Sequence, residues 1–169
     1  MKNIVNLLVL LILFQSCKND VTISSIDSVN WDKRKVENKL PESLISGTTY
    51  LSVYSQIYSQ SENRIHDLTS TVSIRNTSRQ DTIFIKNADY FDTNGKFIRS
   101  YFDQPIYIAP METIEIIIDE LDKKGGTGAN FIFDWNTQPN TSEPLFESVM
   151  ISTYGQQGLS FTTQGKRLN

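Results

Sequence analysis

Acidic residues gather around a tryptophan in the last third of the chain, where Asp134, Glu143 and Glu147 lie close in sequence to Trp135. Two carboxyl groups about 5 to 9 Å apart perform glycoside hydrolysis. Acidic residues at strand ends are more commonly solvated or cap turns, so a hydrolase that uses these carboxylates is an alternative here. Trp135 is expected either in the core or on a face that binds carbohydrate or peptide.

His66 is the only histidine of the chain. One histidine cannot build a multi-histidine metal site. No Gly-x-Ser-x-Gly elbow is present to support catalysis by a serine, a histidine and an aspartate. The sequence around His66 is more simply a loop that enters a strand. We therefore predict no catalytic residue, no metal site and no cofactor.

The richest glycine cluster contains Gly125, Gly126 and Gly128 and is followed by Asn130. A phosphate cradle places backbone N–H groups at the start of a helix that follows a strand. Here the cluster leads into the apolar residues 131–133, which are typical of a strand. The glycines are therefore expected to allow a tight left-handed loop. An anion-binding nest is the alternative, supported by the two lysines directly before the cluster.

The N-terminal sequence is typical of a secretory signal. Lys2 precedes an apolar run of about eleven residues, from Ile4 to Phe14, and Ser16 follows. The run is too short to span a bilayer, which takes about 20 residues. Cys17, the only cysteine, comes next, as in bacterial lipoproteins whose thiol is acylated before the signal is removed. We expect Cys17 to carry acyl chains such as palmitate, and the alternative is a cleaved signal with a chance cysteine.

Two acyl signals or more give stable membrane attachment. We therefore expect a protein anchored to a membrane of the cell envelope, with the outer membrane favoured by the residues after Cys17. The formal net charge is −3, and it becomes −4 when Lys2 leaves with the signal. Nucleic acid is not expected as a partner, because binding it takes a concentrated positive surface.

The chain is long enough for one domain. We assign residues 1–16 to the signal peptide, residues 17–46 to the lipidated cysteine and a polar tether, and residues 47–169 to the domain. A short helical piece is expected within residues 31–40. Part of the tether is expected to pack on the domain, because full exposure of Trp31 would be unfavourable.

Short apolar segments separated by turn signals fill the domain. They are rich in aromatic and β-branched residues and recur about every 8–12 residues, which is typical of an antiparallel β-sandwich. The predicted fold class is all-β, with an immunoglobulin-like general architecture. Strands are expected within residues 50–58, 65–76, 82–91, 96–102, 106–108, 113–118, 131–135, 147–153 and 159–161.

The pair Asn94-Gly95 is the sharpest local signal. Both residue types tolerate the positive φ of a type I′ turn, so the flanking segments are predicted to form a hairpin. The turn also resembles the inner part of a calcium-binding loop, but Tyr90 and Tyr101 occupy the outer ligand positions. The hairpin explains these residues without a metal.

Several separated segments resemble one bacterial family. They are Tyr54-Ser55-Gln56-Ile57, Ser73-Ile74-Arg75-Asn76, Tyr90-Phe91-Asp92-Thr93-Asn94-Gly95, Ser100-Tyr101, Gly125-Gly126-Thr127-Gly128-Ala129-Asn130-Phe131, Glu147-Ser148-Val149-Met150 and Gln157-Gly158-Leu159-Ser160-Phe161. Together they are similar to the family catalogued as domain of unknown function thirty-one twenty-four, over roughly residues 47–163. Gln56 departs from the pattern, in which a histidine is expected. The resemblance implies an envelope protein, often lipid-anchored, with no established activity and no catalytic residues to transfer.

We therefore predict a non-enzymatic binding or interaction module. Sandwich loops gather at the ends of the sheets and commonly carry binding, so the loops 125–130 and 139–147 are expected to form one working end. The expected partners are the membrane, through the anchor, and a protein or glycan. The alternatives are the hydrolase and a purely structural lipoprotein. The residues predicted to bind are Gly125, Gly126, Gly128, Asn130, Trp135 and Glu147.

Overall fold

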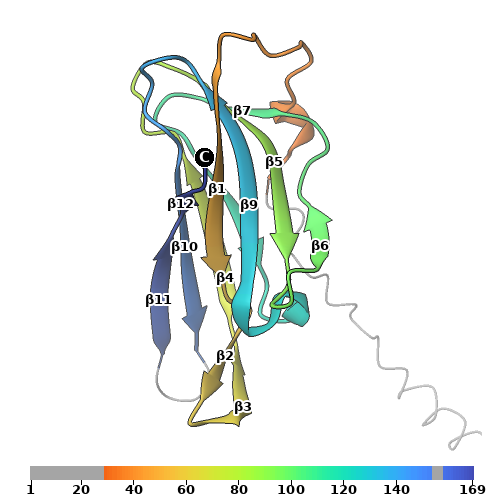
Figure 1. The fold of residues 1–169 in the computed structure, drawn as a ribbon. Coiled ribbons are helices and arrows are strands. Elements are labelled where there is room, and N and C mark those ends of the chain that lie inside the picture. Colours follow the sequence, from red (N-terminus) through yellow and green to blue (C-terminus); the bar gives the residue numbers. More distant parts are fainter. Residues whose placement is uncertain (1–28, 154–157) are drawn as a thin grey trace, which may run out of the picture.

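The computed structural model describes residues 29–153 and 158–169, and every element named below lies within them (Figure 1). Cys17 lies outside this part of the chain, so its lipidation stays a prediction. Two short 3-10 helices are present, η2 (Asp32–Arg34) and η3 (Lys123–Gly128). The strands are β1 (Ile45–Val53), β2 (Gln56–Ser59), β3 (Ser61–Asp67), β4 (Thr69–Arg75), β5 (Ile83–Phe91), β6 (Phe97–Ser100), β7 (Ile106–Ile108), β8 (Thr113–Ile118), β9 (Ala129–Thr137), β10 (Leu145–Ser152), β11 (Leu159–Gln164) and β12 (Lys166–Arg167).

Two antiparallel sheets pack face to face. One has the strand order β12-β1-β9-β5-β6, with β7 also paired to β5, and the other has the order β11-β10-β4-β8. Figure 1 shows the two layers and the β2–β3 hairpin, which projects beyond one end of them. This arrangement confirms the predicted all-β antiparallel sandwich, whereas the immunoglobulin-like detail stays a prediction.

The core forms because successive side chains of a strand point to opposite faces. In β9, Phe131, Phe133 and Trp135 are buried, while the residues between Ala129 and Trp135 that alternate with them are half-buried on the outer face. The rings of Phe131 and Phe133 stack with centroids 5.2 Å apart. The ring of Phe133 also stacks on Phe146 of β10 at 4.5 Å, which joins the two sheets across the core.

The β5–β6 hairpin is present as predicted, with Phe91 opposite Phe97. Its turn is not type I′, because such a turn needs positive φ at both central residues and only Gly95, at φ 75°, has it. The physical reason lies in Asp92, whose Oδ1 accepts the backbone N–H groups of Asn94 and Lys96, both at 2.8 Å. This side-chain bonding favours an ordinary turn that closes on a left-handed glycine.

Two of the predicted strands are each divided into two. The break in the first comes at Ser55, whose N–H donates to the Gly126 carbonyl at 3.2 Å and whose carbonyl accepts from Leu68 N–H at 2.9 Å. The chain leaves the sandwich there, forms the β2–β3 hairpin and returns at Leu68. The division therefore results from contacts with η3, far away in sequence.

Residues 29–44, here called the strap, lie along the side of the sandwich that carries β7 and β8. Val36 N–H donates to the Pro105 carbonyl at 2.8 Å, and Lys35 forms an isolated antiparallel bridge with Ile106. The helical piece expected within residues 31–40 is only η2, because Lys35 turns to pair with β7. The structure thus places this part of the predicted tether against the sandwich.

Among the residues that the structure describes, no helix is long and apolar enough to cross a bilayer.

Candidate binding site

The glycine cluster packs against the tip of the β5–β6 hairpin. Thr93 donates both its backbone N–H and its hydroxyl to the Gly125 carbonyl, each at 3.0 Å, and its hydroxyl oxygen accepts from Gly128 N–H at 2.9 Å. The expected left-handed backbone is found at Gly126, with φ 71°. The remainder of the cluster is the 3-10 helix η3 rather than an open loop. Its contacts give these glycines a structural role, and their predicted role in binding stays a prediction.

Gly125 itself is buried beneath two hydroxyl groups. A Cβ atom at this position would lie 2.0 Å from Tyr90 Oη and 2.6 Å from Ser55 Oγ. The same two hydroxyls share a hydrogen bond of 2.8 Å. Glycine is therefore needed here for close approach of the backbone, which the sequence alone did not indicate.

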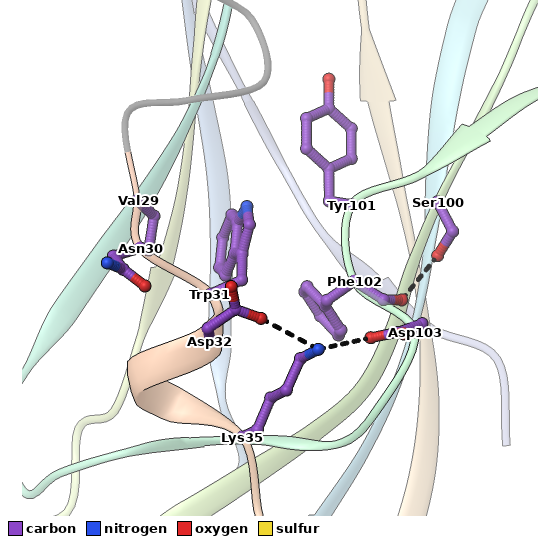
Figure 2. Close-up of a pocket in the computed structure, with 9 residues that line it drawn as sticks. All are labelled: Val29, Asn30, Trp31, Asp32, Lys35, Ser100, Tyr101, Phe102 and Asp103. Carbon is purple, nitrogen blue, oxygen red and sulfur yellow. Dashed lines mark hydrogen bonds and ion pairs between the residues drawn. The ribbon is translucent and has the colours of Figure 1, made fainter.

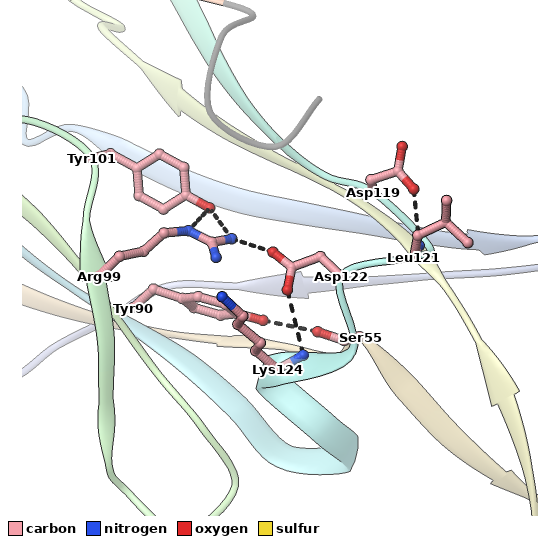
Figure 3. Close-up of polar contacts among 8 residues, drawn as sticks. All are labelled: Ser55, Tyr90, Arg99, Tyr101, Asp119, Leu121, Asp122 and Lys124. Carbon is pink, nitrogen blue, oxygen red and sulfur yellow. Dashed lines mark hydrogen bonds and ion pairs between the residues drawn. The ribbon is translucent and has the colours of Figure 1, made fainter. Parts of the chain in front are cut away.

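A buried polar cluster lies beside this contact (Figure 3). Arg99 Nη2 donates to Asp122 Oδ2 at 2.5 Å, and its Nε and Nη2 donate to Tyr101 Oη at 3.1 and 2.9 Å. The Arg99 guanidinium lies 5.2 Å from the ring centroids of both Tyr90 and Tyr101. Only 17% of the Arg99 side chain and 4% of the Asp122 side chain are exposed. Sequence reasoning missed this cluster, because no spacing links residues 99 and 122.

The surroundings of the polar cluster shift the pKa values of both tyrosines and of the arginine. Burial raises the pKa of Tyr90, and that of Tyr101, above the ordinary value of 10.0, so both hydroxyls stay protonated. Burial alone would lower the pKa of Arg99, but Tyr101 and Asp122 outweigh it, and the pKa is raised. A buried ion pair of this kind is costly to break by removing one partner. The cluster therefore fits a structural role, because its groups are engaged with one another.

The predicted carboxylates are not brought together. Asp134 accepts a hydrogen bond from Thr48 Oγ1 at 2.6 Å on the outer face of β9. Glu147 pairs with Arg75 at 3.0 Å on the outer face of β10, in the other sheet. Glu143 forms an ion pair with Arg167. Asp134 and Glu147 thus lie on opposite faces of the sandwich and cannot act on one glycosidic bond.

His66 lies on β3, in the projecting hairpin. It lines a pocket of about 450 Å³ together with Asp67 and Glu120. Glu147 lines a different pocket, of about 370 Å³, on the outer face of the four-stranded sheet. Within the described ranges, no three His, Cys, Asp or Glu residues come close enough together to hold a metal ion.

Trp135 is part of the core. It is 1% exposed, and its Nε1–H donates to Thr49 Oγ1 at 2.9 Å. Gly47 faces it across the β1–β9 pair, and a Cβ there would lie 2.2 Å from the Trp135 ring. The aromatic face expected for a carbohydrate or peptide is therefore not offered by Trp135. Asn130 is half-buried in β9, between Ser52 of β1 and Phe91 of β5.

The two loops expected to form one working end lie at opposite ends of the sandwich. β9 begins directly after η3 and ends directly before the loop that leads to β10. Nine strand residues separate the loops, which at about 3.3 Å per residue is about 30 Å. The expectation of a shared end is wrong, because it did not consider that one continuous strand connects the loops.

A pocket of about 620 Å³ opens between the strap and the segment that follows β6 (Figure 2). Trp31 of the strap contacts Phe102, with ring centroids 5.2 Å apart. The residues that line this pocket, here called the strap pocket, are Val29, Asn30, Trp31, Asp32, Lys35, Ser100, Tyr101, Phe102 and Asp103.

The polar groups of the strap pocket form a chain at its mouth. Lys35 Nζ lies 2.9 Å from Asp32 Oδ1 and 3.1 Å from Asp103 Oδ1. The hydrogen bond from Lys35 lowers the pKa of Asp103 below 3.8, and the bonds to Asp32 and Asp103 raise the pKa of Lys35. The side chains of Asp32 and Asp103 are 86% and 76% exposed, so their carboxylates accept further hydrogen bonds from solvent or from a ligand.

The indole N–H of Trp31 is a buried donor in the same region. It has no hydrogen-bond partner among the described residues. Sequence reasoning noted that exposure of Trp31 was unfavourable but assigned it to the tether. It missed the strap pocket, because the pocket depends on contact between two segments about 70 residues apart.

These features define an antiparallel β-sandwich with a strap along one side and an open pocket of mixed polar and aromatic lining. The chain belongs to the family described as "Protein of unknown function (DUF3124)", whose model matches residues 46–168, so the predicted resemblance is confirmed. The match spans β1 to β12, while the strap residues before 46 lie outside it. No curated protein and no solved structure matches the chain.

Proposed function

We propose that this protein is a lipid-anchored cell-envelope module that binds a glycan without chemical conversion, and that the glycan enters the strap pocket. The anchor is acylated Cys17, and the favoured membrane is the outer membrane. Both follow from the sequence alone. The binding role rests on one observation, the strap pocket of about 620 Å³.

The chemistry of the pocket supports a ligand with many hydroxyl or amino groups. Asp32 and Asp103 present exposed carboxylates, which accept hydrogen bonds from such groups. Trp31 and Tyr101 supply amphipathic rings, which combine an apolar body with a polar tip. A sugar has both an apolar ring face and polar edges, so it matches this combination. Small-molecule sites commonly join an apolar lining to a few placed polar groups.

The hydrolase alternative is not favoured by a specific observation, since Asp134 and Glu147 lie on opposite faces of the sandwich. A purely structural lipoprotein would leave the strap pocket without a ligand. The glycan-binding module and the purely structural lipoprotein therefore differ in whether the strap pocket binds a ligand.

Calorimetric titration of the full chain in detergent micelles with soluble oligosaccharides of the envelope tests the proposal. We expect saturable binding that Asp103→Ala weakens about tenfold, the loss that follows removal of a charged hydrogen-bond acceptor. Glu62→Ala is the matched control, because it removes an exposed carboxylate from the projecting hairpin. Equal affinities for Asp103→Ala and Glu62→Ala, or no heat with any oligosaccharide, would exclude this site for glycans.

The anchor is tested separately from the pocket. Cys17→Ala should move the protein from the membrane fraction to the soluble fraction of native cells, and labelled palmitate should no longer be incorporated. Cys17→Ala protein that stays in the membrane fraction would contradict the anchor and leave the binding experiment unaffected.

A further inference from the structure

Two residues that line the strap pocket carry hydrogen-bond donors that are not used within the site. The first is the indole N–H of Trp31, which is buried and has no hydrogen-bond partner among the described residues. A buried donor that lacks a partner is costly, because it has lost its bonds to water without replacement. This N–H is therefore the group of the strap pocket that gains most from an acceptor on a ligand.

The second donor is the hydroxyl of Tyr101, a residue that is 8% exposed. Its oxygen accepts from Arg99 Nε at 3.1 Å and from Arg99 Nη2 at 2.9 Å. A hydroxyl has two lone pairs and one proton, so both lone pairs are engaged and the O–H is left to donate. Bonds from a cation polarise a hydroxyl and strengthen it as a donor.

The donors and the carboxylates lie on different sides of the pocket. In Figure 2 the indole nitrogen of Trp31 and the hydroxyl of Tyr101 both point upward. The ion pairs of Lys35 with Asp32 and Asp103 lie below them. The strap pocket therefore has a side that donates hydrogen bonds and a side that accepts them.

The charge of the pocket decides which kind of acceptor fits the donor side. Among the described residues that line it, Asp32 and Asp103 carry two negative charges against the one positive charge of Lys35. The charge of Arg99, behind Tyr101, is balanced by Asp122 at 2.5 Å. Like charges brought together oppose binding. A neutral carbonyl oxygen is thus a better acceptor here than a carboxylate or a phosphate.

We propose that the strap pocket selects glycans built from N-acetylated amino sugars, whose amide carbonyl accepts from Trp31 and Tyr101. The hydroxyl groups of the sugar then donate to Asp32 and Asp103. The acetyl methyl group adds an apolar contact with the aromatic wall, as is common in small-molecule sites. This inference rests on the proposed function, because it names the class of glycan that enters the same pocket.

A small movement of the strap brings the indole nitrogen to the ligand. The nitrogen is covered in the structure, and the carbonyl reaches it when the ring of Trp31 tilts toward the pocket. Trp31 is the N-cap residue of η2, which is a single turn of three residues with no buried residue. The local packing therefore allows this tilt without disturbing the sandwich.

Calorimetric titration of the full chain in detergent micelles compares tri-N-acetylchitotriose with cellotriose. The two trisaccharides have the same linkage and differ in whether each sugar carries an N-acetyl group or a hydroxyl group. We expect tri-N-acetylchitotriose to bind about tenfold more tightly. Trp31→Phe keeps an aromatic ring but removes the N–H, so it should weaken tri-N-acetylchitotriose by several-fold to about tenfold and leave cellotriose unchanged.

The indole N–H signals in a nitrogen-15 spectrum of the wild-type chain report the same contact directly. The Trp31 proton should move downfield with tri-N-acetylchitotriose and not with cellotriose. The indole N–H of Trp135, which donates to Thr49 in the core, is the internal control and should not move.

Three outcomes decide the matter. Equal affinity for the two trisaccharides would overturn the selection for N-acetyl groups and leave glycan binding itself in place. Tighter binding of tri-N-acetylchitotriose with no shift of the Trp31 signal would overturn the role given to this donor. No binding of either trisaccharide, or of any other oligosaccharide, would remove the proposed function together with this inference.

Discussion

The substitution Gly125→Ala tests whether the glycine cluster serves packing. The new Cβ would lie 2.0 Å from Tyr90 Oη, 2.6 Å from Ser55 Oγ and 2.8 Å from Ala129 Cβ, all well inside contact distance. Overpacking in a well-packed interior costs about 1–3 kcal/mol. Loss of the hydrogen bond between Tyr90 and Ser55 adds about 1 kcal/mol. We expect the free energy of unfolding to fall by about 2–4 kcal/mol.

Urea unfolding followed by circular dichroism measures this change. A loss of about 2–4 kcal/mol corresponds to a midpoint lower by about 1–2 M at a slope of about 2 kcal/mol/M. Gly128→Ala is the matched control, because its Cβ would meet Thr93 Cγ2 at 3.3 Å, a contact that a small shift relieves. We expect it to cost less than about 1 kcal/mol.

A double substitution shows whether the Tyr90 hydroxyl causes the loss. Tyr90→Phe removes the atom closest to the new methyl group, so its cost and that of Gly125→Ala should not add. The pair should lose about 1 kcal/mol less than the sum of the two single variants. If Gly125→Ala were within about 0.5 kcal/mol of the wild-type chain, packing would not explain this glycine.

Two further predictions concern the hydrogen bonds of Thr93 and the ion pair between Arg34 and Glu112. Thr93→Val should lower the free energy of unfolding by about 1–2 kcal/mol, because it removes the hydroxyl that bonds to both Gly125 and Gly128. Thr93→Ser keeps a hydroxyl and should retain most of this stability. Urea unfolding of the two variants measures the difference. The hydrogen bond from Arg34 lowers the pKa of Glu112 below 4.5, so this pair stabilises the fold above pH 4.5 and is lost as pH falls through the lowered pKa. Glu112→Gln should thus reduce the acid loss of stability between about pH 7 and pH 3 by up to about 1 kcal/mol, and an unchanged loss would contradict this.

Much of the fold could be predicted because it follows from local patterns. The alternation in β9 and the β-branched run of β8 indicate strands without knowledge of their partners. The residue at which a strand ends could not be predicted from local patterns in the same way. β1 ends before Ser55 because the backbone of Gly126 bonds to it there, and no local signal marks that contact.

The candidate site was harder to predict, because its parts are distant in sequence. The strap pocket depends on Trp31 meeting Phe102, and the polar cluster depends on Arg99 meeting Asp122. Trp135 was among the residues predicted to bind, but it is in the core, because its position in the alternation of β9 directs its side chain inward. Sequence proximity to carboxylates therefore misled the prediction of a shared site.

The chain has two tryptophans, and they lie in very different places. Trp31 sits in the strap against Phe102, and Trp135 is sealed between the sheets. Intrinsic fluorescence therefore offers a reporter for each region. In a Trp135→Phe variant the remaining emission would come from the strap alone. Release of the strap into water would shift that emission to longer wavelength while the sandwich stayed folded.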